Sequence, residues 1–181
     1  MNRLPPLKTL LLSLILVTTA VANDDIEREQ QRIAREMIQV LNAYAVYKMG
    51  QYEEAFSRYK VLAEAGNQQG MLNVANMYAK GLGVEQDPSL AFIWYQRSAE
   101  AGDAISMLEL AQAYRHGQGV EADEARALHW FRQAANAGEP DAQWQLARHL
   151  MAEGETDEAR LWAERAASQG QVAAQQFLRL P

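Results

Sequence analysis

The sequence predicts an all-α protein, a right-handed α-solenoid of stacked helix pairs, and three observations support this. Residues 67–102 and 103–138 align without a gap, and 14 of the 36 aligned positions are identical. Apolar residues within each copy recur at three- and four-residue steps, which is the period of one helix face. Small residues recur in register at Ala75, Ala111 and Ala147, where a larger side chain would hold neighbouring helices apart.

The first 22 residues have the pattern of a secretory signal peptide. Arg3 and Lys8 supply positive charge, residues 10–17 are apolar apart from one serine, and Ala20 and Ala22 place small side chains at the −3 and −1 sites. We expect cleavage after Ala22 and export of the mature protein. The alternative, a membrane anchor, is disfavoured because the apolar stretch is shorter than the roughly 20 residues that a spanning helix needs.

Residues 23–181 are expected to form the solenoid. Its copies are predicted near residues 37–66, 67–102, 103–138 and 139–170, followed by a capping helix over residues 171–180. The last copy is shorter than the two before it and lacks their glycine-containing loop. Because one helix pair cannot bury its apolar face alone, the stacked copies are expected to share a continuous core.

The segment over residues 24–48 is predicted to be a longer first helix that begins at Asp24 or Asp25. It carries apolar residues, among them Ile26, Ile33 and Met37, between glutamates, arginines and glutamines. Two interpretations are open. The helix is either an N-terminal cap of the solenoid or an element that pairs with a partner or with a second copy of the chain.

Each later copy is expected to contain two helices joined by a loop. In the copy at 67–102, Gly81 and Gly83 end the first helix, because glycine adopts the left-handed conformation at little cost. Asp87 then caps the second helix, with Pro88 at its first position. A phosphate-binding loop would need a preceding strand and a third glycine, so helix termination is the favoured interpretation.

This spacing resembles the Sel1-like repeat, a relative of the tetratricopeptide repeat. The resemblance is carried most fully in the copy at 103–138 by Leu110, Ala111, Tyr114, Gly117, Gly119, Val120, Asp123, Ala127, Trp130, Ala135 and Gly138. It implies a protein-interaction scaffold and, for exported bacterial members, a role in envelope complexes, stress signalling or toxin neutralisation. It implies no general catalytic residues. The absence of cysteine departs from the family branch that has a disulfide in each repeat.

Composition and residue patterns disfavour several other functions. A net charge of −6 argues against a nucleic-acid partner, which requires a basic surface. The three histidines, His116, His129 and His149, fall on different helices of the predicted repeat, so we expect no metal site. Acidic pairs recur at the starts of helices, where they serve as caps. We expect neither a cofactor nor an enzymatic activity.

The predicted partner-binding surface is the concave face, which the first helices of tetratricopeptide-like stacks line. Alignment of the copies places twelve side chains there: Tyr44, Tyr47, Lys48, Leu72, Asn76, Lys80, Leu108, Gln112, Arg115, His116, Trp144 and Arg148. Aromatic anchors, the amides of Asn76 and Gln112 and the basic side chains suit an extended or helical segment carrying carboxylates. The alternative is that Leu72, Leu108 and Trp144 only complete the packing between repeats.

The sequence therefore predicts a periplasmic scaffold or adaptor that binds a partner protein or peptide. An alternative binding function is an immunity protein that neutralises a periplasm-delivered toxin in a tight one-to-one complex. A function of another class, a cell-wall or lactam hydrolase, has no motif in its favour. No membrane span is expected after signal cleavage, and the predicted oligomeric state is left open.

Overall fold

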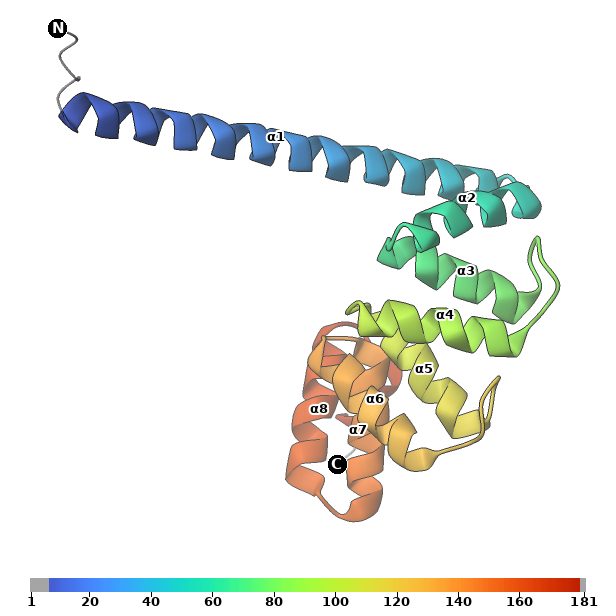
Figure 1. Ribbon diagram of the computed structural model, residues 1–181. Helices are drawn as coiled ribbons and strands as arrows, with labels where there is room; N and C mark the ends of the chain where they lie inside the picture. Colours follow the sequence, from blue (N-terminus) through green and yellow to red (C-terminus); the bar gives the residue numbers. More distant parts are fainter. Residues whose placement is uncertain (1–6, 180–181) are drawn as a thin grey trace, which may run out of the picture. The chain divides into compact units, whose positions relative to one another are not determined.

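In the computed structural model, residues 7–179 are described, and every regular element in this part of the chain is an α-helix (Figure 1). The all-α prediction is therefore confirmed. The helices are α1 (Leu7–Lys48), α2 (Tyr52–Glu64), α3 (Gln68–Lys80), α4 (Pro88–Glu100), α5 (Ala104–His116), α6 (Glu124–Asn136), α7 (Pro140–Glu153), α8 (Thr156–Ser168) and α9 (Val172–Phe177). Within the described residues, no helix combines the length and the apolar character that crossing a membrane requires.

The chain divides into two units, Met1–Asn42 and Ala43–Pro181, with the boundary inside α1. In the first unit α1 is unbroken, because the sequence has no glycine or proline between Leu7 and Lys48. The expectation that a helix begins at the aspartates near residue 24 is therefore wrong.

The predicted signal peptide is described in its backbone only, and only from residue 7 onward. Residues 1–6, which include Arg3, are not described, and side chains are described only from Asp25 onward. The backbone of residues 7–22 belongs to α1. Cleavage after Ala22 and export stay predictions.

Large apolar side chains are exposed along α1 in the first unit. Between Asp25 and Asn42 they are Ile26, Ile33, Met37, Ile38 and Leu41, with exposed fractions of 47% to 59%. The charged residues of this segment pair along the same helix, since Arg32 donates to Glu29 and Glu36 at 2.6 Å each. Both interpretations of this helix, a cap or a pairing element, therefore stay open.

In the second unit, consecutive helices from α2 to α9 pack against one another in chain order. α3 and α5 have the same length and lie 36 residues apart in sequence, as do α4 and α6. The recurring alanines Ala75, Ala111 and Ala147 are fully buried, as their predicted packing role requires. The largest fully buried side chains between the pairs include Tyr59, Phe131 and Met77.

The predicted helix caps are present. The Asp87 carboxylate accepts hydrogen bonds from the backbone N–H groups of Ser89 and Leu90, both at 2.9 Å, and Pro88 occupies the first helical position. Asp123 accepts from the N–H of Arg126 at 2.8 Å in the next copy. Each cap satisfies N–H groups that the first turn of a helix leaves unpaired.

The second glycine of each loop has a role beyond helix termination. Gly117 ends α5 in the left-handed conformation, as predicted. Gly119 also has a positive φ of 71°, and a Cβ built there would overlap the backbone carbonyl of Pro88. Gly83 approaches the backbone of Tyr52 in the same way, one copy earlier. These glycines therefore hold each loop directly against the second helix of the preceding pair.

Candidate functional site

The structure divides the twelve predicted partner-binding residues by exposure. The exposed residues are Tyr44, Lys48, Lys80, His116 and Arg148, and the half-buried ones are Tyr47, Asn76, Gln112, Arg115 and Trp144. Leu72 and Leu108 are buried, with exposed fractions of 5% and 6%. The packing interpretation therefore accounts for these two leucines, and they are not available to a partner.

Several of the remaining residues already have partners within the chain. Lys48 lies over the ring of Tyr44, with Nζ 5.7 Å from the ring centroid. The amide oxygen of Asn76 accepts a hydrogen bond from the Tyr95 hydroxyl at 2.7 Å. Trp144 packs against Phe177, with ring centroids 5.7 Å apart. Asn76 thus cannot offer its oxygen to a peptide backbone without losing Tyr95.

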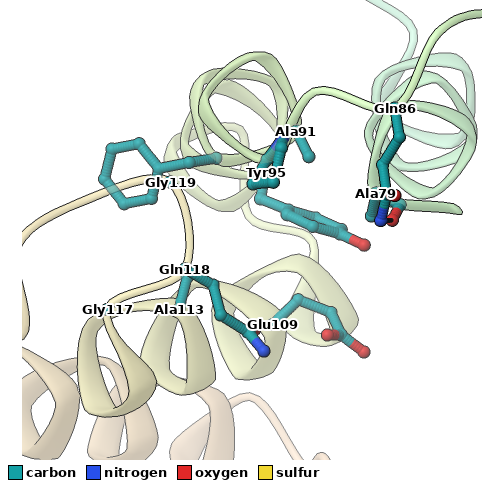
Figure 2. Close-up of a pocket in the computed structure, with 11 residues that line it drawn as sticks. Ala79, Gln86, Ala91, Tyr95, Glu109, Ala113, Gly117, Gln118 and Gly119 are labelled. Atoms are coloured by element: carbon teal, nitrogen blue, oxygen red, sulfur yellow. Dashed lines mark hydrogen bonds between the residues drawn. The ribbon is translucent and has the colours of Figure 1, made fainter. Parts of the chain in front are cut away.

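A pocket lies between two repeats, and we name it the first inter-repeat pocket. It has a volume of about 480 Å³ and is formed by the end of α3, the start of α4, α5 and the loop after α5 (Figure 2). Its lining residues are Ala79, Gln86, Pro88, Ala91, Phe92, Tyr95, Glu109, Ala113, Gly117, Gln118 and Gly119. The wall is about equally polar and apolar, and its polar side chains offer a carboxylate, a phenol and two amides.

Glu109 is the charged group of this pocket. Figure 2 shows its carboxylate and the Tyr95 hydroxyl on opposite sides of one open space, with the Gln118 amide nearby. Burial raises the pKa of Glu109, the Lys80 ammonium opposes that shift, and the Glu139 carboxylate adds to it. Burial also raises the pKa of Tyr95, with a smaller contribution from the charge of Glu109, so Tyr95 is a neutral hydrogen-bond donor at neutral pH.

The equivalent space one repeat later, the second inter-repeat site, has a different content. Arg115 occupies the position of Ala79, and its guanidinium carbon lies 4.2 Å from the ring centroid of Phe131. Its Nη1 donates to Gln145 Oε1 at 3.2 Å. The cavity that remains is about 170 Å³, lined by Arg115, Gln145, Arg148 and His149.

The second site brings together two of the predicted contact residues. Arg115 and Arg148 both donate to the single oxygen Gln145 Oε1, the latter at 3.5 Å. The Arg115 guanidinium also lies 3.6 Å from Glu124, whose side chain is 60% exposed. Two guanidinium groups, with ten N–H donors between them, thus face few acceptors within the chain. This corner is basic although the protein is acidic.

Metal chemistry has no cluster to support it here. Among residues with described side chains, no group of three or more His, Asp or Glu residues is placed to hold a metal ion. His149 instead lies 3.2 Å from Glu153 on its own helix.

Comparison with known proteins identifies the repeats. The family model described as Sel1 repeat matches residues 68–103, 104–139 and 140–171, together more than half of the chain. The chain belongs to the Sel1 repeat family. The matched Sel1 repeats begin one residue later than the copies predicted at 67, 103 and 139, and the copy predicted near 37–66 is not among them.

Two solved structures share the Sel1 solenoid. A Sel1 repeat protein from Oxalobacter formigenes is 30% identical with a TM-score of 0.69, over 75% of this chain and 56% of that one. The protective antigen c5321 of uropathogenic Escherichia coli, which displays an SLR fold, is 29% identical with a TM-score of 0.70, over 79% of this chain and 32% of that one. This chain thus spans about half of the first protein and a third of the second. No protein of curated function matches it.

Most residues of the first inter-repeat pocket are not among the contact residues that the sequence predicts. Tyr95 and Phe92 lie on the second helix of a Sel1 repeat, and Gln118 lies in a loop interpreted only as a helix end. Glu109 lies on a first helix, but the alignment placed it off the predicted face. A usable signal was present in the pair Ala79 and Arg115, where one copy has the smallest side chain and the next has one of the largest.

Proposed function

We propose that this protein is an exported Sel1-repeat adaptor that acts in a bacterial periplasm. It binds a partner protein through the face formed by the first helices of its pairs, α3, α5 and α7. Sel1 repeats are protein-interaction scaffolds and are typically not enzymes, which supports binding as the activity. The signal-peptide pattern of residues 1–22 supports export.

The observation that carries the proposal is the basic corner of the second inter-repeat site. Arg148 is exposed, Arg115 is held in place by Phe131 and Gln145, and exposed His116 and half-buried Trp144 are predicted to lie on the same face. Guanidinium groups and an indole on one face have the composition of an interface hot spot. In a chain with a net charge of −6, such a corner selects a segment that carries carboxylates.

Affinity capture from the envelope of the source cell tests this binding face. The variant Trp144→Ala/Arg148→Ala removes the indole and the exposed cation and is expected to lower partner recovery at least about tenfold, because hot-spot truncations cost about 2 kcal/mol or more. The matched control Arg160→Ala/Leu161→Ala changes an arginine and an exposed apolar residue on α8, the second helix of the same pair. It is expected to leave recovery unchanged.

A charge-reversal variant and the stoichiometry of the complex test the proposed binding face further. Arg148→Glu changes one exposed side chain, so its loss of capture cannot be attributed to unfolding. Equal recovery by this variant and the control would refute the proposed face. A partner recovered at strict one-to-one stoichiometry with very tight binding would replace the adaptor by an immunity role. Fractionation of cells expressing the full chain, with Asn23 as the mature N-terminus, tests export.

A further inference from the structure

The second inter-repeat site shows how this repeat framework holds a guanidinium. Arg115 extends from the end of α5, lies over the ring of Phe131 on α6, and donates to Gln145 on α7. Its side chain is only 25% exposed. The site therefore consists of an aromatic floor, a polar acceptor on the next first helix, and a guanidinium enclosed between them.

The first inter-repeat pocket has the same framework without the guanidinium. The residues 36 positions earlier are Tyr95 in place of Phe131 and Glu109 in place of Gln145. Ala79 replaces Arg115, so the position that supplies the guanidinium in the second site has only a methyl side chain here. The pocket is correspondingly larger, about 480 Å³ against about 170 Å³.

Tyr95 and Glu109 make the first pocket a better receptor for a cation than the second site, which has Phe131 and Gln145 in their places. Glu109 offers a carboxylate where Gln145 offers an amide, and hydrogen bonds between ionised partners are about twice as strong as neutral ones. The side chains described include none that forms an ion pair or hydrogen bond with the Glu109 carboxylate. The hydrogen bond from Tyr95 to Asn76 fixes the ring, so the floor is already in position.

We propose that the first inter-repeat pocket binds an arginine side chain of a partner protein, in the way that the second site binds the chain's own Arg115. This deepens the proposed function and rests on it, since the arginine is supplied by the protein that the solenoid captures. The guanidinium stacks on Tyr95 and donates to Glu109. Gln118 and Gln86 also line the pocket, and Gln86 Nε2 donates to the Ala79 carbonyl at 2.8 Å. Arginine is favoured over lysine because a planar group both stacks and donates in a fork.

One charged residue competes for the same carboxylate. Lys80 follows Ala79 at the end of α3 and interacts electrostatically with Glu109. Its side chain is exposed, so its ammonium stays hydrated and gains little by entering the pocket. A guanidinium is more weakly hydrated and stacks on an aromatic ring, and it therefore displaces Lys80.

The probe for this site is N-acetyl-arginine amide, titrated into the ¹⁵N-labelled full-length protein and followed by NMR. We expect saturable shifts of the backbone amides of Gly117, Gln118 and Gly119, with a dissociation constant in the millimolar range. The matched probe N-acetyl-citrulline amide has a neutral urea in place of the guanidinium. It is expected to bind at least about tenfold more weakly.

Variants of the pocket give an independent readout. Glu109→Gln reproduces the polar residue of the second site and is expected to weaken the arginine probe about tenfold or more. Ala79→Arg supplies the guanidinium from the chain itself and is expected to raise Tm by about 2–4 °C relative to Ala79→Met, a control of similar reach without charge. That gain is expected to disappear when Glu109→Gln is combined with Ala79→Arg.

Absence of shifts at the loop amides, or equal shifts with the citrulline probe, would overturn the inference. It would also be overturned if Glu109→Gln left the arginine affinity unchanged. These results are distinct from a failure of the proposed function. Partner capture that survives Glu109→Gln but not Arg148→Glu would leave the adaptor role standing and remove only the arginine pocket.

Discussion

The two inter-repeat sites are built from the same parts, yet one is open and the other is filled by the chain itself. In both, an aromatic ring from the second helix of a pair faces a polar side chain from the next first helix, Tyr95 with Glu109 and Phe131 with Gln145. The backbone is repeated, so the difference in function comes from single side chains. Ala79 leaves the space in the first pocket open to a ligand, whereas Arg115 at the equivalent position fills the second site.

The two inter-repeat sites also differ in whether a loop bounds them. The first pocket is closed on one side by residues 117–119, which Gly119 holds against the start of α4. The copy at 140–171 has no such loop, and α7 instead ends at Gly154 directly before α8. The second site is therefore bounded by the helices alone. Shortening a repeat by four residues removes a wall without disturbing the stack.

The largest effect is expected where a loop meets the preceding pair. Gly119→Ala places a Cβ against the carbonyl of Pro88 at a φ of 71°, so the first pocket loses its wall or the backbone shifts. The left-handed conformation and the overlap together are expected to lower the free energy of unfolding by about 2–5 kcal/mol, measured by urea denaturation.

Gly138→Ala is the matched control for this change. Gly138 has a φ of 98°, but a Cβ built there meets nothing within 4 Å. The control isolates the conformational cost, about 1–2 kcal/mol. Equal destabilisation by the two variants would show that contact between the loop and α4 contributes nothing to stability.

A smaller effect is expected from emptying the second site. Arg115→Ala removes the guanidinium from the Phe131 ring and the hydrogen bond to Gln145. Because this side chain is three-quarters buried, the expected loss of stability is about 1–3 kcal/mol, measured by thermal or urea unfolding. The variant would open the space over the Phe131 ring that Arg115 fills in the wild type.

Arg126→Ala provides the comparison for Arg115→Ala. Arg126 also lies over an aromatic ring, that of Tyr114 at 5.3 Å, and it pairs with Asp123, but its side chain is 62% exposed. Exposed pairs of this kind contribute about 0–1 kcal/mol. If Arg115→Ala cost no more than Arg126→Ala, Arg115 would be a surface residue and not an enclosed guanidinium.

The two sites also show which features of the structure could be predicted from the sequence and which could not. The 36-residue alignment predicted the helix pairs, the caps at Asp87 and Asp123 and the buried alanines, because each follows from local chemistry repeated in register. The alignment did not predict how deeply each side chain of the expected binding face is buried. Leu72 and Leu108 lie on the expected helices but point into the core, since an error of one residue turns a helical side chain by about 100°.

The residues that line the first inter-repeat pocket could not be predicted for another reason. Tyr95, Glu109 and Gln118 come from α4, α5 and the loop after it, and their convergence depends on how successive pairs stack. A periodic pattern specifies which face of each helix is buried, and it does not specify which side chains meet across three elements. The continuity of α1 through the expected start at Asp24 shows the same limit, since a capping residue is a permitted start rather than a required one.

The smallest effect concerns the charge that distinguishes the two sites. Burial raises the pKa of Glu109 in the folded protein above its ordinary value of 4.5, with Glu139 adding to the shift and Lys80 opposing it. The folded state therefore binds more protons than the unfolded state between these two pKa values, and the ionised Glu109 lowers stability as the pH rises through them. Glu109→Gln, which copies the second site, is expected to be more stable than the wild type at neutral pH. The difference should vanish well below pH 4.5, where the wild-type carboxyl is protonated in both states. Paired thermal melts from pH 3.5 to 7.5 measure this difference.

A constant difference across that range would mean that the substitution acts through packing. The carboxylate would then already be compensated within the chain. The first pocket would have no unpaired charge to offer a partner's arginine.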